Sequence, residues 1–342
     1  MKTRAEQFAT LFPDAPAYRW RQIEDALWGD AKGWSEVTAL PKAMQAKLEK
    51  EVPWMSVEAG TVQQSAKKDT YKALLKLADG AVIESVLMLN RREQWTICVS
   101  SQVGCAMRCA FCATGKMGLK RNLSTDEITD QYRFWKNFLK GASRISNIVF
   151  MGMGEPLANY ENVRAALNTL LARTDLGETR ITVSTVGVLP RLDQILTDKE
   201  WPHVKLAISL HSADPETRKA IVPTSYDEFL PKIESWSKSY LKILGNRRHH
   251  LTFEYVMLRG VNDTPEHAKL LSKFVTRIGN IKVNLIPYNF TNGEFERSFD
   301  ERIDGFLAEL ESHDITATRR RTMGDDIAAA CGQLIVVSTK WG

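Results

Sequence analysis

The chain has 342 residues, of which 44% are hydrophobic and 25% are charged, the ordinary proportions of a soluble globular protein. Its apolar runs fall short of the roughly 18 residues that a membrane span needs, and the N-terminus has no signal-peptide core, so we expect a cytoplasmic protein. The 46 Lys and Arg residues outnumber the 41 Asp and Glu residues, and the net charge of +5 permits an RNA partner without requiring one.

The first 94 residues predict two small units ahead of the main domain. Residues 1–55 are expected to form a helical accessory domain, because apolar residues recur at helical spacing in 17–28 and 34–52, with Pro41 near the start of the second helix. Residues 56–94 alternate between apolar and polar side chains, which predicts a linker with a short β-extension. Asp79 and Gly80 lie between its two apolar runs and predict the tight turn of a hairpin.

The main domain, 95–342, alternates strand-like and helical segments. Between and after the strands, helical periodicity covers 161–173, 189–196, 227–244, 264–278 and 300–312, followed by a short basic strand over 315–321 and a final helix over 324–334. The six predicted strands lie within 96–101, 147–153, 180–187, 204–211, 251–258 and 282–289.

Near-continuous apolar strands separated by amphipathic helices are typical of a parallel sheet covered by helices, an α/β fold. Six repeats favour a partial (β/α)6 barrel, although periodicity alone leaves a doubly wound sheet open. In such folds the functional site lies at the carboxyl ends of the strands.

Three cysteines follow the first strand of this domain at a C-x3-C-x2-C spacing. Cys105, Cys109 and Cys112 stand in a glycine-flanked loop, with no fourth cysteine close by. Three thiolates suit a 4Fe–4S cluster that keeps one iron open to another ligand, whereas structural zinc usually takes four ligands. A three-ligand zinc site and unrelated buried thiols remain the alternatives.

Polar residues end the later strands and point to a small-molecule site beside the cysteines. Gly154 and Glu155 follow the second strand, where glycine permits close backbone approach and the carboxylate can accept hydrogen bonds. Ser184, Ser209 and Asn289 end the third, fourth and sixth strands, and their polar groups suit ribose or carboxylate oxygens. His211 is either part of this site or a structural hydrogen-bond donor. Basic clusters near 116–121, 247–250 and 319–321 are either solvated loops or a rim that contacts phosphates.

Two cysteines lie outside the triad. Cys98 precedes it by seven residues, and Cys331 lies near the C-terminus with Gly332 directly after it, which predicts an exposed turn. Free cysteines are often small buried hydrophobic residues, but an exposed thiolate can also be alkylated by a sulfonium methyl donor.

Taken together, these segments resemble the RlmN/Cfr family of radical S-adenosylmethionine (SAM) enzymes, which methylate a ring carbon of adenine in RNA. The resemblance runs from about residue 17 to 333 and is carried by 98–128, 149–163, 181–190, 206–212, 254–263, 284–289 and 324–334. The loop after Asn289 departs from the usual family pattern.

The resemblance implies a role for each matching residue. Cys105, Cys109 and Cys112 would bind a 4Fe–4S cluster. A first SAM would methylate Cys331, and a second would yield the radical that activates this methyl group. Cys98 would resolve the covalent protein–RNA intermediate through a disulfide with Cys331, and Glu84 would accept a proton, although its spacing to Cys98 is one residue longer here. SAM would be bound by Gly154, Glu155, Ser184, Ser209, Leu210, His211 and Asn289.

The resemblance also implies the substrate and partners. We expect methylation of carbon 2 of an adenosine in 23S rRNA, with tRNA as a second candidate, by a monomer that receives electrons from a flavodoxin or ferredoxin. The residues before Cys331 look more like the RlmN branch than the Cfr branch, which methylates carbon 8. A radical SAM enzyme with a non-RNA substrate and an iron–sulfur RNA-binding or sensor protein are the remaining alternatives.

Overall fold

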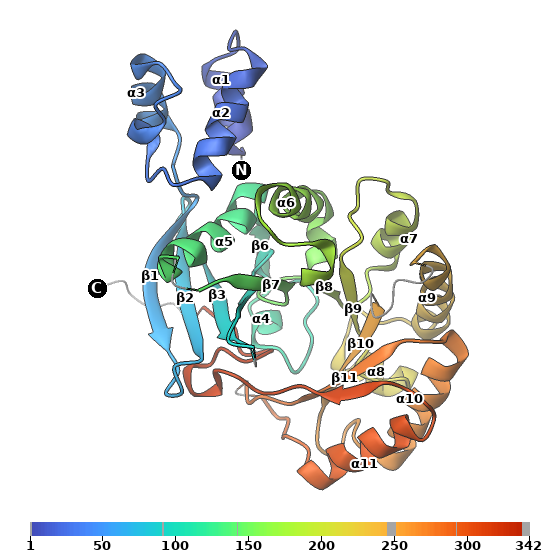
Figure 1. The fold of residues 1–342 in the computed structure, drawn as a ribbon. Helices are drawn as coiled ribbons and strands as arrows, with labels where there is room; N and C mark the ends of the chain where they lie inside the picture. Colours follow the sequence, from blue (N-terminus) through green and yellow to red (C-terminus); the bar gives the residue numbers. More distant parts are fainter. Residues whose placement is uncertain (1, 91, 142, 245–250, 292, 337–342) are drawn as a thin grey trace.

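A ten-stranded sheet forms the centre of the computed structural model, which describes residues 2–90, 92–141, 143–244, 251–291 and 293–336 (Figure 1). The strand order is β1-β2-β3-β4-β7-β8-β9-β10-β11-β12, and within the described residues the sheet is open rather than closed. Neighbouring strands from β4 to β12 pair in parallel. The six predicted strands are confirmed as β4 (Trp95–Cys98), β7 (Ile145–Phe150), β8 (Ile181–Thr185), β9 (Lys205–Ser209), β10 (Leu251–Met257) and β11 (Lys282–Pro287).

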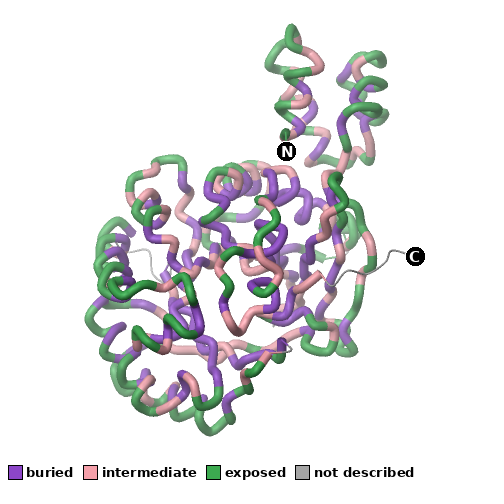
Figure 2. The backbone as a smooth tube through the Cα atoms, turned by 180° about the vertical axis from the view of Figure 1, so that it is seen from behind, coloured by how far each residue is buried: buried purple, intermediate pink, exposed green. Residues whose placement is uncertain are grey.

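Amphipathic helices cover the outer face of the parallel strands. Apolar side chains of strands and helices form one core, which includes the fully buried Ile148, Val183, Leu206 and Phe253. Figure 2 shows that buried backbone gathers in the interior and exposed backbone on the outside. No helix in the described part of the chain is long and apolar enough to cross a bilayer. The helices are α5 (Thr125–Leu139), α6 (Tyr160–Arg173), α7 (Leu189–Thr197), α8 (Pro215–Ile221), α9 (Phe229–Leu244), α10 (Pro265–Ile278) and α11 (Asp300–Glu311).

An antiparallel extension continues the sheet beyond β4. It consists of β1 (Val57–Gln64), β2 (Thr70–Leu77) and β3 (Val82–Leu89), and β3 pairs with β4. The predicted hairpin turn is confirmed: Gly80 has a φ of 79°, which glycine adopts without strain, and Asp79 accepts a hydrogen bond from the amide of Ala81. The extension therefore belongs to the same sheet as the main domain.

Three helices stand apart from the sheet at the N-terminus (Figure 1). They are α1 (Arg4–Leu11), α2 (Ala17–Trp28) and α3 (Lys42–Glu51), and they share a separate apolar core around Ile23, Trp34 and Leu48. The predicted helix over 34–52 is wrong in its first half, because a single 3-10 turn at Trp34–Glu36 ends well before Pro41 caps α3. The first helix was not predicted, although Thr3 and Glu6 form a capping box at its start.

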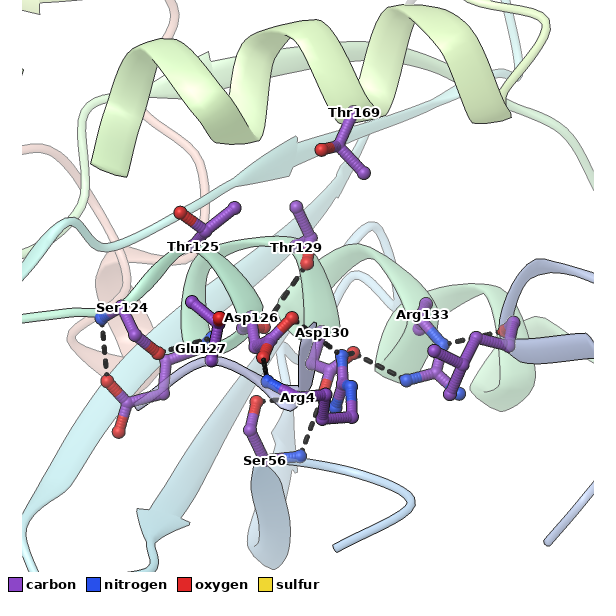
Figure 3. Close-up of polar contacts among 12 residues, drawn as sticks. Arg4, Ser56, Ser124, Thr125, Asp126, Glu127, Thr129, Asp130, Arg133 and Thr169 are labelled. Carbon is purple, nitrogen blue, oxygen red and sulfur yellow. Dashed lines mark hydrogen bonds and ion pairs between the residues drawn. The ribbon is translucent and has the colours of Figure 1, made fainter. Parts of the chain in front are cut away.

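A buried ionic network fastens these helices to α5 (Figure 3). Arg4, which opens α1, donates to both carboxylate oxygens of Asp130 at 2.6 and 3.0 Å. Arg133 donates to the same carboxylate at 2.6 Å, and the amide and hydroxyl of Ser56 donate to it at 2.7 Å each. Burial alone would raise the pKa of Asp130, but the two guanidinium groups hold it below its usual value.

The predicted helix over 324–334 is not formed. A 3-10 turn at Asp325–Ile327 is the only helical turn there, and the rest of that stretch is irregular. Gly324 and Ala328, with φ of 67° and 50°, are left-handed on either side of the turn, which stops a helix from propagating. The short basic strand before it is confirmed as β12 (Ala317–Arg319).

Candidate active site

The cysteine loop connects the small hairpin strands β5 (Gln102–Gly104) and β6 (Leu119–Asn122). The amide of Cys105 donates to the carbonyl of Gly118 at 3.0 Å, and the amide of Cys112 donates to the carbonyl of Cys109 at 3.0 Å. Gly104 has a φ of 78°, and a Cβ there would lie 1.9 Å from the Gly118 oxygen, so only glycine closes this loop. The loop thus holds its three thiols through main-chain contacts.

Burial raises the pKa of each of the three thiols, and that of Cys105 reaches about 12. The buried guanidinium of Arg218, on α8, opposes this rise at Cys109. Arg218 stacks on the ring of Phe229 at 3.8 Å, and its Nη2 donates to the carbonyl of Val186 at 2.8 Å. Burial thus favours the neutral thiols, and the ligation of a metal cluster would require their deprotonation.

One cavity of about 150 Å³ gathers most of the predicted site; we name it the triad cavity. The three cysteines of the loop lie together in the wall of this cavity. Three cysteine thiols are the donor set of a 4Fe–4S cluster that keeps one iron open, so these residues fit that group. The other predicted site residues that line the triad cavity are Gly154, Glu155, Ser184, Ser209, His211 and Cys331.

Glu155 is a buried carboxyl group that the main chain holds in place. Its two oxygens accept hydrogen bonds from the amides of Leu157 at 3.0 Å and Val186 at 2.9 Å. Burial raises its pKa to about 7, although these hydrogen bonds oppose the rise. At Gly154, with a φ of 101°, a Cβ would lie 2.5 Å from the Cβ of Gln102. Gly154 therefore permits the close approach of its own main chain to Gln102.

The serines lie side by side at the ends of β8 and β9. The hydroxyl oxygens of Ser184 and Ser209 are 3.3 Å apart and face the triad cavity. His211 also lines this cavity, but its Nδ1 accepts a hydrogen bond from the amide of Val256 at 3.1 Å instead of donating. Burial lowers its pKa to about 3, with a further contribution from Arg218, so the imidazole is neutral. Leu210 is fully buried in the main core and is not among the residues that line the triad cavity.

A second cavity, of about 200 Å³, lies beside the first, and we name it the Cys98 cavity. Cys98, at the end of β4, and Cys331 both line it, and Cys331 also lines the triad cavity. Asn289 lines the Cys98 cavity and not the triad cavity: its amide donates to the carbonyl of Cys331 at 3.1 Å and accepts from the hydroxyl of Thr322 at 3.0 Å. The structure thus places Asn289 against the main chain of Cys331.

The two separate cysteines differ in exposure. Cys331 is exposed on a turn, as predicted, and Gly332 after it has a φ of 86°. Cys98 is buried, which raises the pKa of its thiol to about 12, and the thiol of Cys331 adds to the rise. Arg320 lines both cavities and opposes the rise at Cys98.

Glu84 is buried on β3 at 2% exposure and lies outside the walls of both cavities. One of its oxygens pairs with Lys72 at 3.0 Å, and the other accepts from the amide of Ile335 at 2.8 Å. Burial raises the pKa of Glu84, and Lys72 opposes this. The residue assigned by resemblance as a proton acceptor therefore has both oxygens engaged elsewhere.

Sequence reasoning missed the charged residues around the thiols. Arg320 contacts Glu254 at 3.3 Å inside the site. The only sequence signal for this residue was its place in a basic run. Its neighbours Arg319 and Arg321 pair with Asp300 and Asp69. The cluster at 247–250 lies outside the described residues.

Comparisons with known proteins show the family of this chain. The Radical SAM superfamily model matches residues 99–271. The dual-specificity RNA methyltransferase RlmN of Alcanivorax borkumensis is 40% identical, over 89% of this chain and 81% of its own length. A probable dual-specificity RNA methyltransferase RlmN of Chlorobium phaeobacteroides is 38% identical, over 95% and 91%.

A solved structure extends the agreement to the fold. The crystal structure of a radical SAM methyltransferase from Sphaerobacter thermophilus has a TM-score of 0.88 and 38% identity, and the match covers 97% of each chain. Proteins that are this similar over nearly their whole length belong to the same family within the superfamily. The chain therefore belongs to the radical SAM superfamily and, within it, to the RlmN family of RNA methyltransferases.

Proposed function

We propose that this RNA methyltransferase methylates carbon 2 of an adenosine in 23S rRNA, with tRNA as a second substrate, and that Cys331 carries the methyl group. The observation that supports this most is the place of Cys331, which borders both cavities. One of them holds the cysteine triad and the other holds Cys98. A methyl group on this sulfur would lie between the site that activates it and the residue that releases it.

The reaction begins on Cys331. Its thiolate attacks the methyl carbon of one SAM, S-adenosylhomocysteine leaves, and the sulfur of Cys331 becomes a methyl thioether. Cys105, Cys109 and Cys112 would hold a 4Fe–4S cluster, which would supply, with a second SAM, the radical chemistry that takes one hydrogen atom from this methyl group. The methylene carbon on Cys331 then forms a bond to the ring carbon of adenine. That carbon loses its proton and the adduct gives up one electron, for which the one-electron chemistry of the cluster would be the acceptor, so that a closed-shell thioether joins protein and RNA.

Cys98 releases the product. It assists removal of the ring proton and then attacks the sulfur of Cys331, so that a disulfide forms as the carbon–sulfur bond breaks and the carbon takes up a proton. Burial favours the neutral thiol of Cys98 in the resting protein, and the nearby Arg320 favours the thiolate that the attack needs.

The substrate follows from the chemistry of the adduct. The adenine ring must reach Cys331 in the Cys98 cavity, so it has to be unstacked, and an RNA loop presents such a base more readily than a duplex. The proposal includes two SAM molecules in each turnover, a flavodoxin or ferredoxin as reductant, and a monomer acting in the cytoplasm.

Nucleoside mass spectrometry of rRNA and tRNA tests the proposal, with strains that have or lack this gene. We expect 2-methyladenosine in 23S rRNA only when the gene is present. 8-Methyladenosine in its place would assign the Cfr-type reaction, and no change in either nucleoside would contradict an RNA adenine substrate. The Cys331→Ala variant, with an intact cysteine triad, is the matched control and should yield no methylated adenosine.

A further inference from the structure

The segment that carries Cys331 is fastened to the antiparallel extension by one buried ion pair. Lys72 of β2 and Glu84 of β3 face each other at 3.0 Å, and their side chains are 10% and 2% exposed. Lys72 also donates to the carbonyl of Ala328 at 3.2 Å, and Glu84 also accepts from the amide of Ile335 at 2.8 Å. The pair thus contacts the main chain three residues before Cys331 and four residues after it.

Two exposed contacts extend this attachment toward the start of the segment. Arg321 pairs with Asp69 at 3.1 Å, and the carboxylate of Asp326 accepts from the amide of Ala66 at 2.7 Å. The C-terminal segment therefore contacts β2 and β3 on one side, and on the other side it contacts Asn289 and the cysteine loop, where the amide of Ala113 donates to the carbonyl of Gly332 at 2.8 Å. Since this segment forms no regular element between 328 and 336, its polar main-chain groups depend on such partners.

We propose that the Lys72–Glu84 pair is a positioning device that holds the loop of Cys331 at the boundary of the two cavities. The inference rests on the proposed role of Cys331 as methyl carrier. Glu84 acts through the main chain of this loop and not as the proton acceptor. Lys72 shares that task equally, although a lysine ammonium cannot accept a proton.

The geometry separates the two roles of Glu84. A proton acceptor must reach the proton that it removes, within hydrogen-bond distance or through one water. Glu84 is buried outside both cavity walls, and its two oxygens are occupied by Lys72 and Ile335. A clamp needs this arrangement, because each charge satisfies the other while both hold the same loop.

Three variants test the clamp. Lys72→Met removes the ammonium and keeps most of the apolar stem, and Glu84→Gln replaces the carboxylate with a group of the same size. Lys76→Met is the matched control, because Lys76 lies on the same strand with its side chain exposed. The full-length protein is used, without SAM, cluster or RNA, and native-state hydrogen exchange is measured across the chain.

We expect amides in 328–336 to exchange at least roughly tenfold faster in Lys72→Met and Glu84→Gln. Exchange in Lys76→Met and in strands β8 to β11 of every variant should match the wild type, which separates loop release from global unfolding. In the loaded enzyme, both clamp variants should lose RNA methylation to a similar degree.

Unchanged exchange of the loop in both clamp variants would overturn the positioning role. So would a Glu84→Gln variant that loses RNA methylation while Lys72→Met keeps it, since that pattern assigns chemistry to Glu84. The exchange result needs no substrate, so faster loop exchange supports the clamp even where the methylated product differs from 2-methyladenosine. Failure of the clamp and failure of the proposed function are thereby distinguished.

Discussion

Asp130→Asn should release the N-terminal helices from α5. The carboxylate of Asp130 is fully buried and accepts hydrogen bonds from Arg4, Arg133 and Ser56 (Figure 3). The substitution keeps the shape but removes the charge that two buried guanidinium groups share. Breaking a buried pair by removing one partner costs about 3–5 kcal/mol, because the remaining charge is left uncompensated.

Asp126→Asn is the control for this substitution. Its carboxylate also contacts Arg4, at 2.6 Å from the main-chain amide and 3.2 Å from the guanidinium, but its side chain is 20% exposed. We expect a smaller loss of about 1.5 kcal/mol. Urea unfolding measures both losses, and native-state hydrogen exchange of 4–51 shows whether the helices undock separately. An Asp130→Asn protein within about 1 kcal/mol of the wild type, with protected helices, would refute the account of this junction.

Two further predictions concern the site. Gly154→Ala places a Cβ 2.5 Å from the side chain of Gln102 at a φ of 101°. Urea unfolding should therefore show a free energy of unfolding lower by about 1–3 kcal/mol from backbone strain, and lower still from overpacking. Gly177→Ala is the control and should change this free energy little, because nothing lies within 4 Å of its Cβ position. The pKa of His211 is about 3 in the folded protein against 6.5 ordinarily, so the unfolded chain binds the proton more readily and stability falls as the pH drops below 6.5. At about pH 5 the loss in the free energy of unfolding is about 2 kcal/mol. A His211→Asn variant whose free energy of unfolding falls as steeply with pH as that of the wild type would contradict this prediction.

The parallel strands were predictable because each is an apolar run with buried neighbours on both sides. Val183 and Leu206, for example, stand in runs whose composition leaves no other placement than the core. The cysteine triad was equally readable, since its members are close in sequence and one loop brings them together. Local sequence patterns were sufficient to predict the strands and the cysteine loop, because each is marked by residues close in sequence.

The C-terminal segment was not predictable in the same way. Its alanine-rich stretch favours a helix by propensity. The structure instead gives its polar groups to Lys72 and Glu84, more than 200 residues earlier in the chain. Gly324 and Ala328, which have left-handed backbone conformations, interrupt the helix in this segment. Partners so far apart in sequence leave no periodic signal, and this is also why the engagement of both oxygens of Glu84 could not be foreseen.

The covalent adduct on Cys331 tests the central claim most directly. Cys98→Ala removes the residue proposed to release the product and leaves the triad and Cys331 in place. The purified variant, loaded with cluster and SAM, is incubated with RNA under reducing conditions and digested, and its peptides are measured by mass spectrometry. The account predicts an adenosine joined to Cys331 through one carbon. A Cys98→Ala variant that turns over normally, or that stalls with an unmodified Cys331, would contradict it.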